Sequence, residues 1–189
     1  IESFVDATDA LTINLGTLDG ARRKVIRLAV DIAIRRAKPW IIDPVHCDYS
    51  PSRLAFAHDL AKLHPSIVRG NAAEMAVIGE TGTALRIETG PVDRLQDATR
   101  RVRIVNGHPL MAKVTGTGCL SGGVIAAFMA VERDVMLAAT AALVVTGVSA
   151  QIAAEGARGP GTFEPAFLDA LFSLDAKDVL STARIEHDD

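Results

Sequence analysis

The sequence has only two cysteines among its 189 residues, Cys47 and Cys119, so it lacks the paired cysteines that hold small secreted domains together. It also lacks an excess of positive charge, because 20 Lys and Arg against 23 Asp and Glu give a formal net charge of −3. This balance implies no general attraction to nucleic acid or to an anionic membrane. The low cysteine count predicts a protein of the reducing cytoplasm.

Long uninterrupted apolar runs are also missing. We find no signal peptide and no apolar run, free of charge and glycine, that is long enough to span a membrane. The most apolar segment, residues 138–154, contains polar side chains such as Thr140 and Gln151, and we expect it to be a buried core helix. The chain begins with Ile1 rather than Met, and we expect it to be a trimmed product with a segment before this residue.

Two common nucleotide-binding motifs are absent as well. There is no G-x-x-x-x-G-K-[ST], which excludes a P-loop enzyme, and no G-x-G-x-x-G between a first strand and helix, which makes dinucleotide binding a weak hypothesis. We find no internal repeat, no low-complexity segment and no second domain. The length and the 49% hydrophobic and 23% charged composition fit one α/β domain over residues 1–189.

What the sequence does contain is a loop of Gly and Thr that leads directly into an apolar helix of small residues, Val114–Ala127. We predict that Thr117 caps this helix, because its hydroxyl can bond a free N–H of the first turn. Gly116 and Gly118 let the backbone approach a ligand closely, and the unpaired N–H groups at a helix start favour a phosphate. Cys119 falls in the first turn, where the pKa of a thiol tends to decrease. The alternative is a tight loop against the core, with Cys119 as a small buried hydrophobe.

Short strands and helices alternate before this loop. We expect strands at residues 11–15, 40–42 and 66–69, with helices at about 19–38 and 51–63 between them. This alternation predicts a parallel sheet with helices on its faces. In such sheets, ligands bind beyond the carboxyl ends of the strands.

Four polar residues lie at or just beyond those strand ends: Asp43, Arg69, Asn71 and Glu74. Phosphoryl transfer needs donors for the phosphate oxygens, a cation, and carboxylates that hold Mg²⁺ or its waters. We therefore predict a kinase in which Asp43 and Glu74 serve the metal and Cys119 lies beside the attacking hydroxyl, orienting it more than deprotonating it. Taken singly, Asp43 could start a turn and Glu74 could favour a helix dipole. Their joint position at successive strand ends favours the functional interpretation.

The pattern becomes irregular after Glu80. Residues 72–78 allow only a short helix before a strand at 84–88, although a crossover between parallel strands usually takes about a dozen residues or more. The helix is therefore unusually short, or residues are absent between Glu80 and Thr81, and we favour absence.

The second half of the chain is predicted to contain a hairpin and more helices. Alternating apolar and polar residues at 92–95 and 101–105 predict antiparallel strands at a sheet edge. Three helices are expected after the loop, at about 118–132, 134–156 and 164–174. Gly159–Gly161 separates the last two, and the tail from Ala176 is expected to form one more short helix with a frayed, acidic end.

A series of characteristic stretches covers nearly the whole chain. They are Asn14–Leu18, Asp43–Val45, Arg69–Glu74, Thr89–Asp93, Asn106–Met111, Val114–Cys119 and Gly159–Phe163. In these stretches the chain resembles the hydroxyethylthiazole kinases of the ribokinase-like superfamily. Asn106–Met111 combined with the Thr-Gly-Thr-Gly-Cys loop is specific, whereas Asp-Pro-Val is shared across the superfamily.

The resemblance implies a three-layer α-β-α ribokinase-like fold of the α/β class, with a mostly parallel central sheet and an antiparallel edge hairpin. It implies transfer of the ATP γ-phosphate to the hydroxyl of 4-methyl-5-(2-hydroxyethyl)thiazole, in thiamine salvage, with Mg²⁺. It also implies that Gly116 contacts the thiazole, that Cys119 replaces the catalytic Asp of most relatives, and that homotrimers form active sites between subunits. The residues we assign to ATP are Arg69, Asn71, Thr89 and Gly118.

The sequence departs from the family in the loop after Asp43-Pro44-Val45. His46-Cys47-Asp48-Tyr49 stands where family members usually have small, Gly-rich residues, which adds bulk near the site. The alternative is a surface loop without a role, and we expect Cys47 to be structural or incidental, since nothing pairs it with a base. The family's N-terminal segment, with a Met that contacts the thiazole, would precede Ile1.

Two rival functions stay open. A hydroxymethylpyrimidine (phosphate) kinase also carries Gly-Thr-Gly-Cys, but Asn71–Glu74, without a preceding Thr-Pro, and Asn106–Met111 favour the thiazole enzyme. The other rival is a non-catalytic nucleotide-binding protein of the same fold. The presence of Asp43, Glu74 and Cys119 argues weakly against it.

Overall fold

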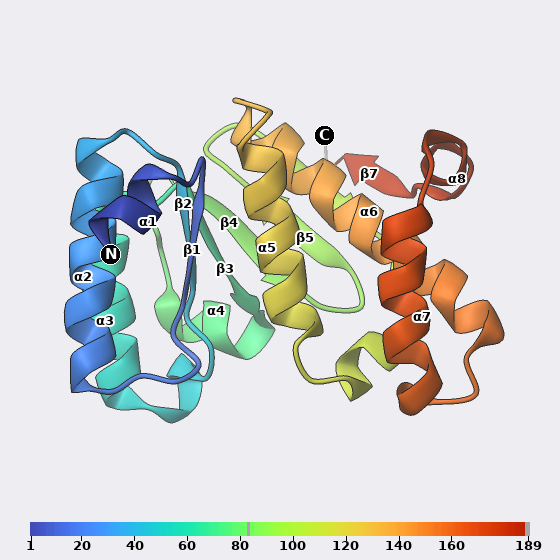
Figure 1. Ribbon diagram of the computed structural model, residues 1–189, viewed down its shortest axis with the longest axis horizontal. Coiled ribbons are helices and arrows are strands. Elements are labelled where there is room, and N and C mark those ends of the chain that lie inside the picture. The colour runs from blue at the N-terminus through green and yellow to red at the C-terminus, as the bar shows by residue number, and fades with distance from the viewer. Residues whose placement is uncertain (83, 188–189) are drawn as a thin grey trace.

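The structure, a computed structural model, describes residues 1–82 and 84–187. A seven-stranded sheet forms its centre, and the strands follow one another in chain order from β1 to β7 (Figure 1). Helices α3 (Pro51–Ala61) and α4 (Ala72–Ile78) pack on one side of the sheet, whereas α5 (Thr117–Met129) and α6 (Val135–Gly156) pack on the other. The arrangement is the predicted three-layer α-β-α fold.

The first four strands are parallel, as predicted. They are β1 (Leu11–Asn14), β2 (Trp40–Asp43), β3 (Ile67–Asn71) and β4 (Leu85–Thr89). Neighbouring residues of β2 face opposite layers, because Trp40 and Ile42 pack into one core cluster and Ile41 into the other. Burial on both faces explains the apolar run Trp40–Ile42 in β2.

Three helices connect the parallel strands: α2 (Gly20–Arg35), α3 (Pro51–Ala61) and α4 (Ala72–Ile78). The carboxylate of Asp19 accepts a hydrogen bond from the N–H of Arg22 and caps α2. Ser50 stands at the N-cap of α3, with Pro51 at the first helical position. These local signals set the helix starts where the sequence predicted them.

The crossover from β3 to β4 uses a helix of only seven residues, α4. Even so, β3 and β4 pair in parallel from Ile67–Leu85 to Asn71–Thr89. The expectation that residues are absent after Glu80 stays a prediction, as does the division into a single domain.

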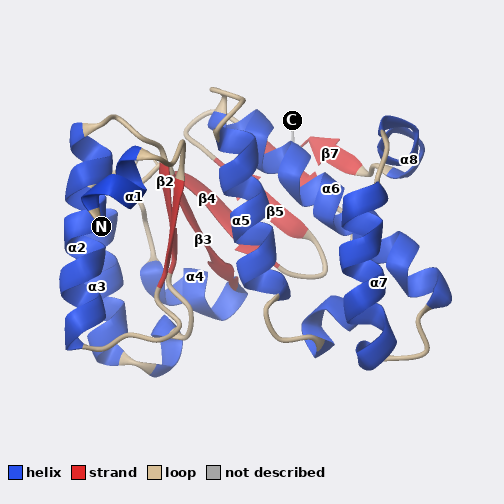
Figure 2. Cartoon of the chain, in the orientation of Figure 1, coloured by secondary structure: helices blue, strands red, loops and turns tan. Residues whose placement is uncertain are grey.

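The far edge of the sheet is antiparallel, as predicted, but it has one more strand than expected. Its strands are β5 (Asp93–Gln96), β6 (Arg101–Ile104) and β7 (Ile185–His187). The short helix predicted from Ala176 is confirmed as α8 (Ala176–Thr182). The prediction of a frayed end after it was wrong, because the chain continues into β7 (Figure 2), which pairs with β6. The side chain of Asn106 holds this tail: it accepts a hydrogen bond from the N–H of Arg184 and donates to the carbonyl of Thr182.

Helices α5 (Thr117–Met129), α6 (Val135–Gly156) and α7 (Pro160–Ser173) complete the fold. The start of α7 was predicted too late, at residue 164, because Pro160 occupies its first turn. Within the described part of the chain, α6 alone is long and apolar enough to cross a membrane. However, 67% of its most apolar window is buried and α6 packs against α5 and α7, which confirms a core helix.

Three short helices escaped prediction: α1 (Glu2–Asp6), η1 (Cys47–Tyr49) and η2 (Pro109–Lys113). The last two are 3₁₀ turns: η1 leads into α3, and η2 leads into the loop before α5. Single turns of this kind lack the several repeats that make an amphipathic pattern recognisable.

Candidate active site

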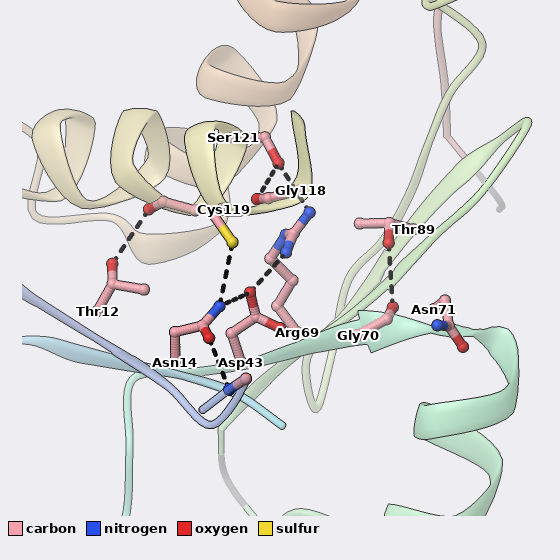
Figure 3. A network of polar contacts seen from close by, with 12 residues as sticks. Thr12, Asn14, Asp43, Arg69, Gly70, Asn71, Thr89, Gly118, Cys119 and Ser121 are labelled. Atoms are coloured by element: carbon pink, nitrogen blue, oxygen red, sulfur yellow. Dashed lines mark hydrogen bonds and ion pairs between the residues drawn. The ribbon is translucent and has the colours of Figure 1, made fainter. Parts of the chain in front are cut away.

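The carboxyl ends of β1, β2 and β3 meet the N-terminal end of α5 (Figure 3). Asn14 and Asp43 end their strands and are paired in register. The Asn14 amide donates one hydrogen bond to Asp43 Oδ2 at 3.0 Å and another to Cys119 Sγ at 3.4 Å. The sheet edge and the Thr-Gly-Thr-Gly-Cys loop are thereby joined at one point, as the strand-end argument predicted for Asp43 and Cys119.

A buried ion pair lies directly behind this point. Arg69, 5% exposed, donates from Nη1 to Asp43 Oδ2 at 3.2 Å, and Asp43 is 3% exposed. The other terminal nitrogen of Arg69, Nη2, donates to Ser121 Oγ at 2.7 Å. The Ser121 hydroxyl in turn donates to the Gly118 carbonyl at 3.0 Å. Arg69 therefore supports the loop from below.

Burial raises the pKa of Asp43, and the nearby Glu74 carboxylate raises it further, whereas Arg69 and Asn14 oppose the shift. A carboxylate buried this deeply depends on its cationic partner to stay ionised. Arg69 consequently sets the charge state of the site as well as its shape.

The start of α5 differs from the prediction for Thr117. The N-cap is Gly116, with φ +100°, a left-handed conformation that glycine adopts without strain. The Thr117 hydroxyl donates instead to the carbonyls of Met111 and Val114, at 2.9 and 3.3 Å, because Thr117 already lies inside the helix. The prediction of Thr117 as the cap was wrong, but the uncapped first turn leaves its N–H groups available to an anion.

Cys119 is exposed in this first turn, with its sulfur directed toward Asn14 (Figure 3). The alternative of a small buried hydrophobe is therefore wrong for Cys119. Cys47 fits that description instead: it is 1% exposed, its Sγ donates to the Glu74 carbonyl at 3.8 Å, and burial raises its pKa to about 11. The burial of Cys47 agrees with the expectation that it is structural or incidental.

Glu74 is buried and forms a capping box at the start of α4. Its Oε2 accepts the N–H of Asn71 at 2.9 Å, and Asn71 Oδ1 accepts the N–H of Glu74 at 3.0 Å. Its Oε1 accepts the N–H of His46 at 2.8 Å. The carboxylate thus fastens the loop after β2 to α4, and it keeps free lone pairs for a cation or its waters.

Thr89 ends β4 opposite Asn71, and its hydroxyl donates to the Gly70 carbonyl at 3.3 Å (Figure 3). Asn71 and Thr89, two of the four residues assigned to ATP, therefore lie side by side at the ends of β3 and β4, and a third, Arg69, lies two residues before Asn71 in β3. Gly118 and Gly116 are exposed in the loop across from them. The individual nucleotide and substrate contacts stay predictions.

Two polar residues of the site were missed by the sequence argument. Asn14 joins Asp43 to Cys119, and the available sequence signals were its position at a strand end before Gly16 and its place in the Asn14–Leu18 stretch. Asp93, at the start of β5, accepts the N–H of Gly90 at 3.0 Å, and burial raises its pKa to about 6. Its place in the Thr89–Asp93 stretch was the available signal.

A mostly parallel sheet between helical layers, with buried charges at its strand ends facing a Gly-rich helix start, is an α/β arrangement of the ribokinase-like fold class. Solved structures agree on the fold. A ribokinase-like superfamily protein from Enterococcus faecalis superposes with a TM-score of 0.69 at 14% identity, covering 90% of this chain and 65% of that one.

The particular family follows from closer comparisons. The model of the hydroxyethylthiazole kinase family matches residues 1–87 and 80–177. A probable hydroxyethylthiazole kinase from Agrobacterium fabrum is 68% identical over 188 residues, which cover 100% of this chain and 76% of that protein. The structure of a hydroxyethylthiazole kinase protein from Pyrococcus horikoshii superposes with a TM-score of 0.96 at 28% identity, covering 100% of this chain and 80% of that one. The chain belongs to the hydroxyethylthiazole kinase family.

Proposed function

We propose that this protein transfers the γ-phosphate of ATP to the hydroxyl of 4-methyl-5-(2-hydroxyethyl)thiazole, in thiamine biosynthesis and salvage. The observation that carries the proposal is the network Cys119–Asn14–Asp43–Arg69–Ser121 beneath the uncapped start of α5. It combines an anion-binding helix start, a buried cation and an exposed polar side chain in one place. The family to which the chain belongs supports the choice of substrate.

The phosphoryl group binds at the start of α5. Gly116 and Gly118 let the phosphate approach the backbone. The first-turn N–H groups donate hydrogen bonds to the phosphate oxygens and so stabilise the negative charge on them. Arg69 adds positive charge from below, where it lies near Gly118 but is tied to Asp43 and Ser121. Preorganised charge of this kind stabilises a transition state without reorganisation cost.

Cys119 orients the acceptor hydroxyl. Asn14 donates a hydrogen bond to its sulfur and so holds it at the carboxyl edge of the sheet. A loose transition state needs little help from a general base. The main contribution of the Cys119 side chain is therefore to orient the acceptor hydroxyl.

Asp43 and Glu74 fit Mg²⁺ that arrives with ATP. Both are carboxylates, the oxygen donors that Mg²⁺ prefers, and both are buried close to the phosphate region. Their oxygens already accept hydrogen bonds from Asn14, Arg69, Asn71 and His46, which favours holding waters of the ion over displacing them. Bound Mg²⁺ would neutralise charge on the phosphates.

The nucleotide would lie over Asn71 and Thr89, with Arg69 and Gly118 beside its phosphates. A putative ribokinase II from E. coli, solved with ATP and Mg²⁺, shares the fold at a TM-score of 0.64 and 18% identity, covering 89% of this chain and 61% of that one. This likeness supports the fold, and the residue assignments rest on the strand-end positions.

A homotrimer in the cytoplasm belongs to the same proposal. Two apolar side chains of α7 are exposed, Leu168 at 49% and Phe172 at 94%. Leu168 also borders a cavity of about 140 Å³ next to Gly116. Apolar side chains exposed beside a site favour a subunit contact there.

The decisive test measures ATP consumption with Mg²⁺ and compares the thiazole alcohol with hydroxymethylpyrimidine. Turnover on the thiazole alone supports the proposal. Turnover on hydroxymethylpyrimidine alone would assign the rival kinase activity. ATP binding without turnover on either alcohol would identify a nucleotide-binding protein instead.

A further inference from the structure

The loop that departs from the family brings three metal-ligating side chains together. His46 and Asp48 come from the segment after β2, and Glu74 comes from the first turn of α4. One ligand atom from each of the three lies within 4.8 Å of the others. A single ion can therefore reach an imidazole nitrogen and two carboxylate oxygens with small side-chain adjustments.

The backbone holds this arrangement in place. His46 has φ +57°, an uncommon left-handed conformation for a residue with a side chain, and its N–H donates to Glu74 Oε1 at 2.8 Å. The next residue, Cys47, is buried and hydrogen-bonds the Glu74 carbonyl. The η1 turn then places Asp48 beside them. Two contacts with Glu74 thus fix the loop on α4 before any ion binds.

The cluster also has an unsatisfied polar atom. Asp48 Oδ1 is buried and has no hydrogen-bond partner within the described part of the chain. A buried carboxylate oxygen without a partner costs free energy, and a second carboxylate nearby, that of Glu74, adds repulsion. A bound cation would remove both penalties.

We propose that His46, Asp48 and Glu74 bind one divalent transition-metal ion of the Zn²⁺ or Mn²⁺ type. An imidazole with two carboxylates suits these ions better than Mg²⁺, which prefers oxygen donors alone. Three protein ligands leave at least one position for water. The ion clamps the loop after β2 to α4, and it needs no nucleotide, which separates it from the Mg²⁺ that accompanies ATP.

The test titrates Co²⁺, a spectroscopic substitute, into tag-free protein without nucleotide, and then displaces it with Zn²⁺. We expect one tightly bound Co²⁺ per chain with visible absorption. His46→Asn is the informative variant because Asn tolerates a left-handed backbone. It should weaken binding by about tenfold or more, and Asp48→Asn should do the same. Calorimetry with Zn²⁺ provides a second measurement.

His64→Asn is the matched control. His64 is also an exposed histidine with a left-handed backbone, φ +56°, but it lies in the turn before β3, away from the cluster. Co²⁺ binding should not change in this variant. Equal affinity in wild type, His46→Asn and His64→Asn would overturn the site, as would the absence of binding in wild type. The titration does not depend on kinase activity, so a protein that binds Co²⁺ but does not phosphorylate the thiazole would refute the proposed function and leave this site standing.

Discussion

The two halves of the sheet use ion pairs in opposite ways. In the parallel half, Arg69 and Asp43 are buried at strand ends and form one connected network with Ser121. At the antiparallel edge, Arg94 pairs with Glu88, and Arg103 with Glu186, across exposed strand surfaces.

The difference in burial indicates different roles for the two kinds of ion pair. A buried pair costs desolvation of both charges, and it is retained where the charge has a task. An exposed pair is screened by water and contributes little. The parallel half therefore carries the chemistry, whereas the antiparallel edge completes the fold.

The largest expected effect breaks the buried pair. Arg69→Met leaves the Asp43 carboxylate buried without its cation, and we expect a loss of about 3–5 kcal/mol in unfolding free energy together with loss of kinase activity. Urea unfolding measures the first, and ATP turnover the second. The matched control at the exposed edge, Arg103→Met, should change the unfolding free energy by about 1 kcal/mol or less and leave turnover unaffected.

A double variant sharpens the same comparison. Asp43→Asn combined with Arg69→Met removes both charges, so part of the lost stability should return while activity stays absent. Equal losses for Arg69→Met and Arg103→Met would show that burial does not distinguish the two halves.

The next effect concerns the two cysteines. Cys119→Ser should lower kcat by about tenfold, with the KM for ATP nearly unchanged. This loss is smaller than the roughly 10²–10⁴-fold decrease in rate expected on removal of a full general base. Cys47→Ser should lower the unfolding free energy, because Cys47 is buried, without a comparable loss in kcat. Steady-state kinetics at saturating thiazole measures both variants. Unchanged kcat in Cys119→Ser would remove this residue from the mechanism.

A smaller effect is expected from Glu74→Gln. The amide keeps the side-chain length but removes the charge, so the Mg²⁺ concentration for half-maximal turnover should rise by about tenfold. A Mg²⁺ titration of turnover at fixed ATP measures this change. Superimposable titrations of variant and wild type would leave Glu74 with its capping role alone.

The smallest effect is pH-dependent and lies where the two halves join. Burial raises the pKa of Asp93 to about 6, so the folded protein binds a proton more tightly than the unfolded chain does. The stabilisation from this group is complete below the ordinary Asp pKa of about 4 and is lost as the pH rises through about 6. Wild type should therefore lose unfolding free energy, relative to Asp93→Asn, between pH 4 and pH 7. Parallel pH profiles for the two proteins would contradict the raised pKa.

Several features of the fold could be predicted because their causes are local. The strands contain short apolar runs, Trp40–Ile42 and Ile67–Val68. Asp19 and Asn71 each cap a helix by accepting the N–H three positions further on, and Ser50 followed by Pro51 marks a third helix start. Other features depend on distant contacts. Strand β7 is held by Asn106, 78 positions before Arg184 in the chain, and nothing in the tail itself signals a strand.

The sequence by itself determined the order of the parallel strands and their connecting helices, the Gly-rich helix start, and the positions of Asp43, Arg69 and Glu74 at or just beyond strand ends. Hydrophobic period, capping and turn chemistry act over a few residues, and they are therefore visible in the sequence. Only the tertiary structure decided that Asn14 joins Cys119, that Arg69 lies buried beneath Gly118, and that His46 meets Glu74. These pairs are far apart in the chain, and their approach depends on how the strands pack side by side in the sheet.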